Sequence, residues 1–242
     1  MHAENPEAAD SILAIATDAI RLLELPPPTC AGGPTAQWLV VSGDALARLA
    51  QLLDLQIRVL ADYPDALRLV ARAVLETWIT GHTALVLGAD GVELLERRSR
   101  DLHRRTFGAT AGPASDPDVP TLTDLAKRLD AELYGASDPP RAFQRHVASF
   151  YDEIDISGVE GTVSLFSSVI DLRDNTAPAP TDDHVDHVRV SLWVVLFLAH
   201  GHLAAIGATD QARTARMLFD RLRRITDDYY AQRRNVSGLA ST

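Results

Sequence analysis

Cysteine is almost absent from this chain of 242 residues, in which Cys30 stands alone. One thiol excludes an internal disulfide framework and is typical of a reducing compartment, so we expect a cytoplasmic protein. The first ten residues, MHAENPEAAD, lack the basic stretch of a secretory signal, and none is expected. Lys127 is the only lysine among the 23 basic residues. Such a bias reflects the gene's base composition, so an arginine here is weak evidence for a guanidinium-specific role.

Aromatic residues are also scarce, at 6% of the chain, and alanine and leucine supply most of the apolar content. This composition favours helices over sheets. The formal net charge of −10 argues against a broad basic surface for nucleic acid, although it leaves room for a local basic patch. The chain has no GxSxG, GxxxxGK[ST] or GxGxxG motif, so no nucleophile elbow or phosphate loop is indicated.

Helical spacing of apolar residues runs through nearly the whole chain, without repeats or strand alternation. We therefore predict one all-α bundle of about seven to eight helices spanning 1–242, with 1–35 peripheral and 235–242 a flexible polar tail. A break is expected in the second helix at Ser42-Gly43. The expected helical segments are 6–24, 36–61, 63–87, 90–107, 121–134, 139–152, a short piece at 162–171, 183–206 and 209–234.

The longest apolar run, SLWVVLFLAHGHLAAIG at 191–207, is almost long enough to cross a bilayer. It carries His200 and His202 with Gly201 between them. A helix buried on all sides of a bundle explains this pattern better than a membrane span.

The segment DALRLVARAVLETWITGHTAL combines a narrow polar stripe with an otherwise apolar surface. Arg72 and Glu76 lie one turn apart on that stripe. Because the helix is so apolar, we expect the pair to be buried, with each charge neutralising the other. Loss of one partner would then cost about 3–5 kcal/mol. His82 falls on the opposite face, beside Trp78, and is expected to be a packed core histidine.

This Arg-x-x-x-Glu helix, together with YDEIDISGVEGT at 151–162, resembles uncharacterised bacterial helical families. In those families a later tyrosine and a serine-centred segment, often ending in His-Gly, precede two long helices. Tyr151, Ser157 and Gly161 match that part, while Glu160 stands where the pattern has its histidine, which weakens a catalytic role there. The resemblance covers roughly residues 36–206. It implies an all-helical fold and no established activity.

Arg141 and His146 form an Arg-x4-His pair like that of small helical ribonucleases of bacterial conflict systems. A chain with this many arginines and histidines holds roughly two such pairs by chance. Five helical residues rotate by about 140°, so the two side chains would not share a face of a regular helix. They could converge only in an irregular first turn after Pro139-Pro140, or across a dimer interface.

The densest basic stretch, ERRSRDLHRRTF at 96–107, places Arg97, Arg100 and Arg104 on one helical stripe. Its alternatives are a solvated helix face and a ridge that faces an anion or RNA. Asp183 and His187, four residues apart, could both reach one metal ion, and so could His184 and His187, three residues apart. A metal site needs at least three ligands, and no ligand motif elsewhere in the chain supplies the rest. We therefore expect no metal and no cofactor.

Two functions from different classes remain open. The first is a non-catalytic helical interaction protein that acts through a protein partner or as a homodimer. The second is a metal-independent ribonuclease, a toxin or defence effector that uses Arg141 and His146. Nucleic acid is the less favoured partner because of the net charge.

Overall fold

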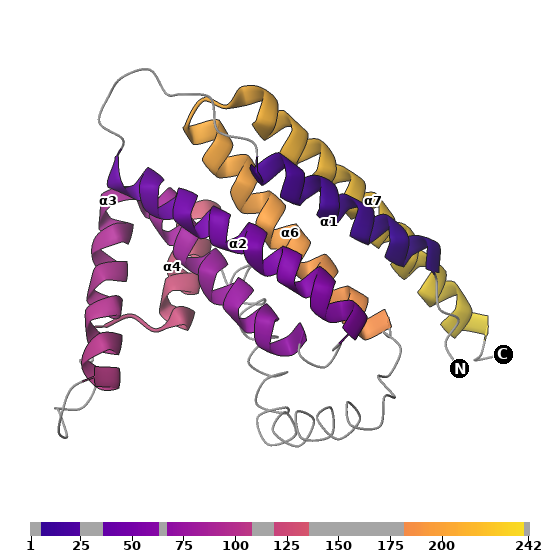
Figure 1. Ribbon diagram of the computed structural model, residues 1–242, viewed down its shortest axis with the longest axis horizontal. Helices are drawn as coiled ribbons and strands as arrows, with labels where there is room; N and C mark the ends of the chain where they lie inside the picture. Colours follow the sequence, from indigo (N-terminus) through magenta and orange to yellow (C-terminus); the bar gives the residue numbers. More distant parts are fainter. Residues whose placement is uncertain (1–5, 25–35, 63–66, 108–118, 136–181, 240–242) are drawn as a thin grey trace.

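The computed structural model describes residues 6–24, 36–62, 67–107, 119–135 and 182–239 (Figure 1). In these ranges the chain forms six α-helices and no strand, which confirms the all-α fold. The described helices number six rather than seven to eight. The expected segments at 139–152 and 162–171 lie outside the described residues, and the expected segments 63–87 and 90–107 are joined in one element, α3. The helices are α1 (Pro6–Glu24), α2 (Gln37–Asp62), α3 (Leu67–Phe107), α4 (Leu122–Tyr134), α6 (Asp182–Ala205) and α7 (Thr209–Leu239).

Helix α6 occupies the centre of the bundle, where it packs against α1, α2, α3 and α7 (Figure 1). Apolar residues surround its axis, so it can bury every side. Its buried apolar residues are Val188, Leu192, Val194, Val195, Leu196, Leu198, Ala199 and Leu203. Among the described residues, the window His187–Ala205 is long and apolar enough to cross a bilayer, and 56% of it is buried inside the bundle. A core helix has the same composition, so the window is weak evidence for a membrane span.

Helix α3 changes direction at Gly88, where the backbone leaves the helical region (φ 61°, ψ −131°). Only glycine adopts such a conformation readily. The part before Gly88 runs beside α2, and the part after it turns away and packs with α4 (Figure 1). We call residues 89–107 the α3 arm. The expected separation between segments 63–87 and 90–107 is therefore a kink at Gly88, after which the helix resumes at once.

Helix α2 is continuous through Ser42 and Gly43, so the predicted interruption there is wrong. A serine and a glycine weaken a helix only modestly, and tertiary packing overrides that cost. At Gly43 a side chain would crowd the ring of His202, because a Cβ atom there would lie 3.2 Å from His202 Cε1. Gly81 of α3 is tighter still: a Cβ would lie 2.6 Å from Leu198 Cδ2 and 2.9 Å from Ala45 Cβ. These glycines let α2, α3 and α6 approach closely.

Helix α4 begins with a capping box formed by Thr121 and Asp124. The Thr121 backbone N–H and hydroxyl donate to Asp124 Oδ2 at 3.0 and 2.7 Å, and the Asp124 backbone N–H donates to Thr121 Oγ1 at 3.1 Å. Hydrogen bonding from Thr121 lowers the pKa of the Asp124 carboxyl. At the other end of the chain, α7 runs on to Leu239 rather than ending at residue 234. No proline stops it in the polar tail.

Candidate functional site

The predicted catalytic pair, Arg141 and His146, lies outside the described residues. Its convergence therefore stays a prediction. The same holds for Tyr151, Ser157 and Gly161 of the family resemblance.

Arg72 and Glu76 form the predicted ion pair, with Arg72 Nε 3.2 Å from Glu76 Oε1. The expected burial is wrong, because 55% of the arginine side chain and 44% of the glutamate side chain remain exposed. The apolar surface of α3 buries Val74, Trp78 and Ile79 on one side and leaves the polar stripe toward solvent. A helix can thus be apolar over most of its circumference and still expose a narrow charged face.

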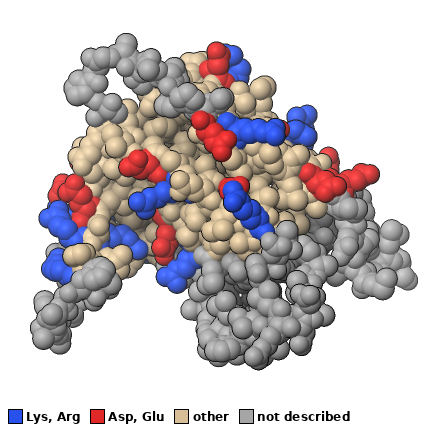
Figure 2. Space-filling view, in the orientation of Figure 1, with Lys and Arg blue, Asp and Glu red and all other residues tan. Residues whose placement is uncertain are grey.

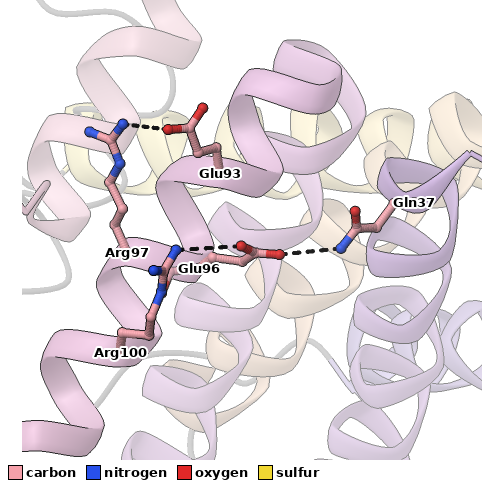
Figure 3. Close-up of polar contacts among 5 residues, drawn as sticks. All are labelled: Gln37, Glu93, Glu96, Arg97 and Arg100. Atoms are coloured by element: carbon pink, nitrogen blue, oxygen red, sulfur yellow. Dashed lines mark hydrogen bonds and ion pairs between the residues drawn. The ribbon is translucent and has the colours of Figure 1, made fainter.

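The arginine stripe of the α3 arm is partly neutralised within its own helix (Figure 3). Arg97 pairs with Glu93, and Arg100 Nη2 lies 3.5 Å from Glu96 Oε2. The other oxygen of Glu96 accepts a hydrogen bond of 3.3 Å from Gln37 Nε2, which ties the arm to the start of α2. The predicted stripe therefore behaves largely as a solvated, ion-paired helix face.

Beyond these pairs, the arm presents an open hollow bordered by Ser99, Arg100, His103 and Arg104. Leu102 does not border this hollow; it is 63% exposed, the largest value among the exposed large apolar side chains of the described residues. Figure 2 shows acidic and basic side chains side by side on the face in view, without an extended field of one sign. The basic residues of the arm are a local cluster on a protein of net charge −10.

The bundle interior contains a polar contact that sequence spacing did not indicate. Ser42 Oγ of α2 lies 2.9 Å from His202 Nδ1 of α6, and both residues are buried. With the serine hydroxyl donating to the Leu39 carbonyl at 3.1 Å, we assign His202 the tautomer in which Nδ1–H donates to Oγ. Burial lowers the pKa of His202, which keeps the ring neutral. The available signal in the sequence is the Ser-Gly step in an apolar helix, which by itself predicts a break in the helix and not a buried contact.

A second histidine, His82, packs in a cluster of aromatic rings, as predicted. Its ring centroid lies 5.4 Å from that of Trp78, edge to face, and 5.1 Å from that of Phe197, stacked. Trp193 and Phe219 extend the cluster from α6 to α7, with centroids 5.5 Å apart. Burial lowers the pKa of His82 to about 3, so the ring is uncharged at neutral pH.

Neither histidine forms a reaction centre with the described groups. The Ser42–His202 distance would suit a nucleophile and its base, but the serine has no exposed surface for a substrate to reach. Among the described residues, no group of three His, Cys, Asp or Glu side chains is placed to hold a metal. The side chains of Asp183 and His184 lie outside that description, so the absence of a metal site there stays a prediction.

The described fold and surfaces define an all-helical bundle with an ion-paired exterior and a projecting arm. Comparison of the chain with protein-family models, with curated proteins and with solved structures found no match.

Proposed function

We propose that this chain is a non-catalytic helical interaction protein and that the α3 arm carries its binding surface for a protein partner. The observation that carries the proposal is the exposure of the arm at residues 97–104. Only Asp101 is buried there, and Arg98 is half-buried. Leu102 faces water in the middle of this stretch.

The geometry of the arm favours binding over a purely structural role. Gly88 turns the arm away from α2, and α4 packs against α3 without covering Leu102. The root of the arm is fixed in the bundle through buried Val92 and through the contact between Gln37 and Glu96. A rigid helix with an exposed apolar residue and a polar rim has the composition of a protein-binding surface. Single exposed apolar residues are common on proteins, so the proposal rests on Leu102 together with the open hollow that the same stretch of helix carries at Ser99, Arg100, His103 and Arg104.

A matched pair of surface variants tests the proposal. Met217 of α7 is 58% exposed and provides the control for Leu102. A photoreactive residue at position 99 is introduced into the full-length chain carrying Leu102→Asp or Met217→Asp, and cross-linked products are compared in cells. We expect Leu102→Asp to remove a discrete protein adduct that Met217→Asp retains, with both variants melting like the parent.

Equal adducts in the two variants would contradict the proposal. The ribonuclease alternative has its own signature: growth arrest on induced expression, relieved by His146→Ala. That result would place the activity outside the α3 arm.

A further inference from the structure

A face of aromatic rings runs along one side of α6. Trp193 and Phe197, one turn apart on α6, stack on each other with centroids 5.5 Å apart. Both lie beside Phe219 of α7, at centroid distances of 5.5 and 6.4 Å. Phe197 also stacks on the buried imidazole of His82 from α3. Trp193, Phe197 and Phe219 are only half-buried, and we call these three residues the aromatic face.

The described helices surround α6 as an incomplete ring. Each of α1, α2, α3 and α7 packs against α6, and neighbours around the ring also pack against each other: α3 with α2, α2 with α1, and α1 with α7. In the described part of the chain, α3 and α7 form no comparable contact. The aromatic face lies at this opening, because its rings connect His82 of α3 to Phe219 of α7. A large apolar face in such a position requires an apolar group to pack on it.

The chain between α4 and α6 is attached at both ends beside this opening. Residues 136–181 connect the end of α4, which packs against α3, to the first residue of α6, and they lie outside the described residues. Attachment at both ends gives this segment a much higher effective concentration at the aromatic face than a separate molecule has. Trp193 and Phe197 also take part in further interactions outside the ring pairs given above.

The helix expected at 139–152 has one strongly apolar side. Phe143, Val147 and Phe150 are spaced by four and three residues, so they share a helix face, and Arg145 lies opposite them. Two phenylalanines suit the site, because aromatic rings pack favourably on tryptophan and phenylalanine in offset or edge-to-face geometry. A helix over these residues is about 21 Å long, enough to cover one turn of α6 and reach α7.

We propose that residues 139–152 dock as a helix on the aromatic face, with Phe143, Val147 and Phe150 against it, and so complete the ring around α6 between α3 and α7. The proposal goes beyond the proposed function and does not depend on the α3 arm. Its occupant is the chain's own segment, and a second copy or another protein is excluded from the face while that segment is docked.

Docking in this orientation bears on the predicted catalytic pair. With about 100° of rotation per residue, Arg141 lies opposite the docked side of the helix and His146 lies at its edge. The two side chains therefore stay apart within a regular docked helix. Cleavage of RNA by this pair would then require the second chain of a dimer.

Photocross-linking in the full-length chain tests the proposal. Benzoylphenylalanine replaces Phe143, and in the control chain it replaces Arg145, on the opposite side of the same expected helix. We expect the probe at position 143 to cross-link within its own chain to residues 189–200 of α6 or 212–223 of α7, as located by mass spectrometry. The probe at position 145 should give neither cross-link. If circular dichroism shows that the first chain has lost helix, Phe150 carries the probe instead.

Thermal melting gives a second, independent measurement. Phe143→Ala should lower the melting temperature by roughly 10 °C, because it removes a buried ring and leaves a cavity. Arg145→Ala should change it by less than about 2 °C. Equal melting temperatures of these two variants overturn the proposal.

Three cross-linking results also overturn it. The first is equal cross-linking from positions 143 and 145, which would mean that the segment has no preferred side. The second is cross-linking from position 143 to α1 or α2 in place of α6 and α7. The third is cross-linking to α6 or α7 only between two chains, which would make a second copy the occupant of the aromatic face.

Discussion

Ser42 Oγ and His202 Nδ1, 160 positions apart in the chain, lie 2.9 Å from each other and join α2 to α6 inside the bundle. Gly43 makes room for the imidazole, since a Cβ atom there would lie 3.4 Å from His202 Nε2. The serine therefore supplies the hydrogen-bond partner and the glycine supplies the space. Together they set how the N-terminal part of α2 meets the C-terminal part of α6.

We expect Ser42→Ala to destabilise the protein by about 1–3 kcal/mol, because it leaves the buried Nδ1–H of His202 without its acceptor. Urea denaturation monitored by circular dichroism measures the change. Ser99→Ala, on the exposed arm, is the control and should stay within about 0.5 kcal/mol of the parent. Equal effects of the two substitutions would show that the Ser42–His202 bond does not stabilise the fold.

The buried imidazole of His82 makes stability depend on pH. Its pKa falls from 6.5 to about 3 on folding, so between these values the unfolded chain binds more protons than the folded one. The contribution of His82 to the free energy of unfolding should therefore be largest above pH 6.5 and should decrease as the pH falls toward 3. At about pH 5 the loss should be on the order of 2 kcal/mol.

His82→Phe separates this effect from that of other titrating groups, because phenylalanine can stack on Phe197 but cannot bind a proton. We expect the difference in unfolding free energy between about pH 7.5 and about pH 5 to shrink in this variant. Ser99→Ala, which removes no titratable group from the exposed arm, should keep the parental difference. An unchanged slope in His82→Phe would mean that the ring is accessible to protons in the folded state.

Gly81→Ala should destabilise the protein even though alanine is the better helix former. The new methyl group would lie 2.9 Å from the Ala45 Cβ atom, which is attached directly to the backbone and can move only with α2. Overpacking of this kind costs typically about 1–3 kcal/mol, more than the gain in helix propensity of up to about 1 kcal/mol. Gly43→Ala should cost less, since its closest contact is 3.2 Å. Thermal melting ranks the two, and the reverse order would refute the steric account.

Arg72→Ala and Glu76→Ala should each change the unfolding free energy by less than about 0.5 kcal/mol, because an exposed pair contributes little. The double substitution closes the cycle and should give a coupling energy of about 0.3–0.5 kcal/mol. Ser42→Ala in the same denaturation series shows that the assay resolves larger effects. A loss of several kcal/mol in either single variant would restore the burial first expected for this pair.

Local signals in the chain predicted much of the helical framework. The apolar spacing from residue 6 to 24 coincides with α1, and the Thr121–Asp124 pattern forms the capping box of α4. The all-round apolar run that contains His202 lies in α6, the central helix. These features depend on residues within one or two turns of each other, so a short window of sequence contains the physics that determines them.

The tertiary structure alone decided which polar residues are buried. Arg72 and Glu76 face water because of how α3 is rotated against its neighbours, which apolar content does not specify. Ser42 and Gly43 stay helical because a histidine from α6 fills the space beside them, and nothing within one turn of either residue announces it. Helical periodicity records which face of a helix is apolar. The partner that covers the face, and the hydrogen bond that it supplies, come from segments far away in the chain, where spacing carries no information.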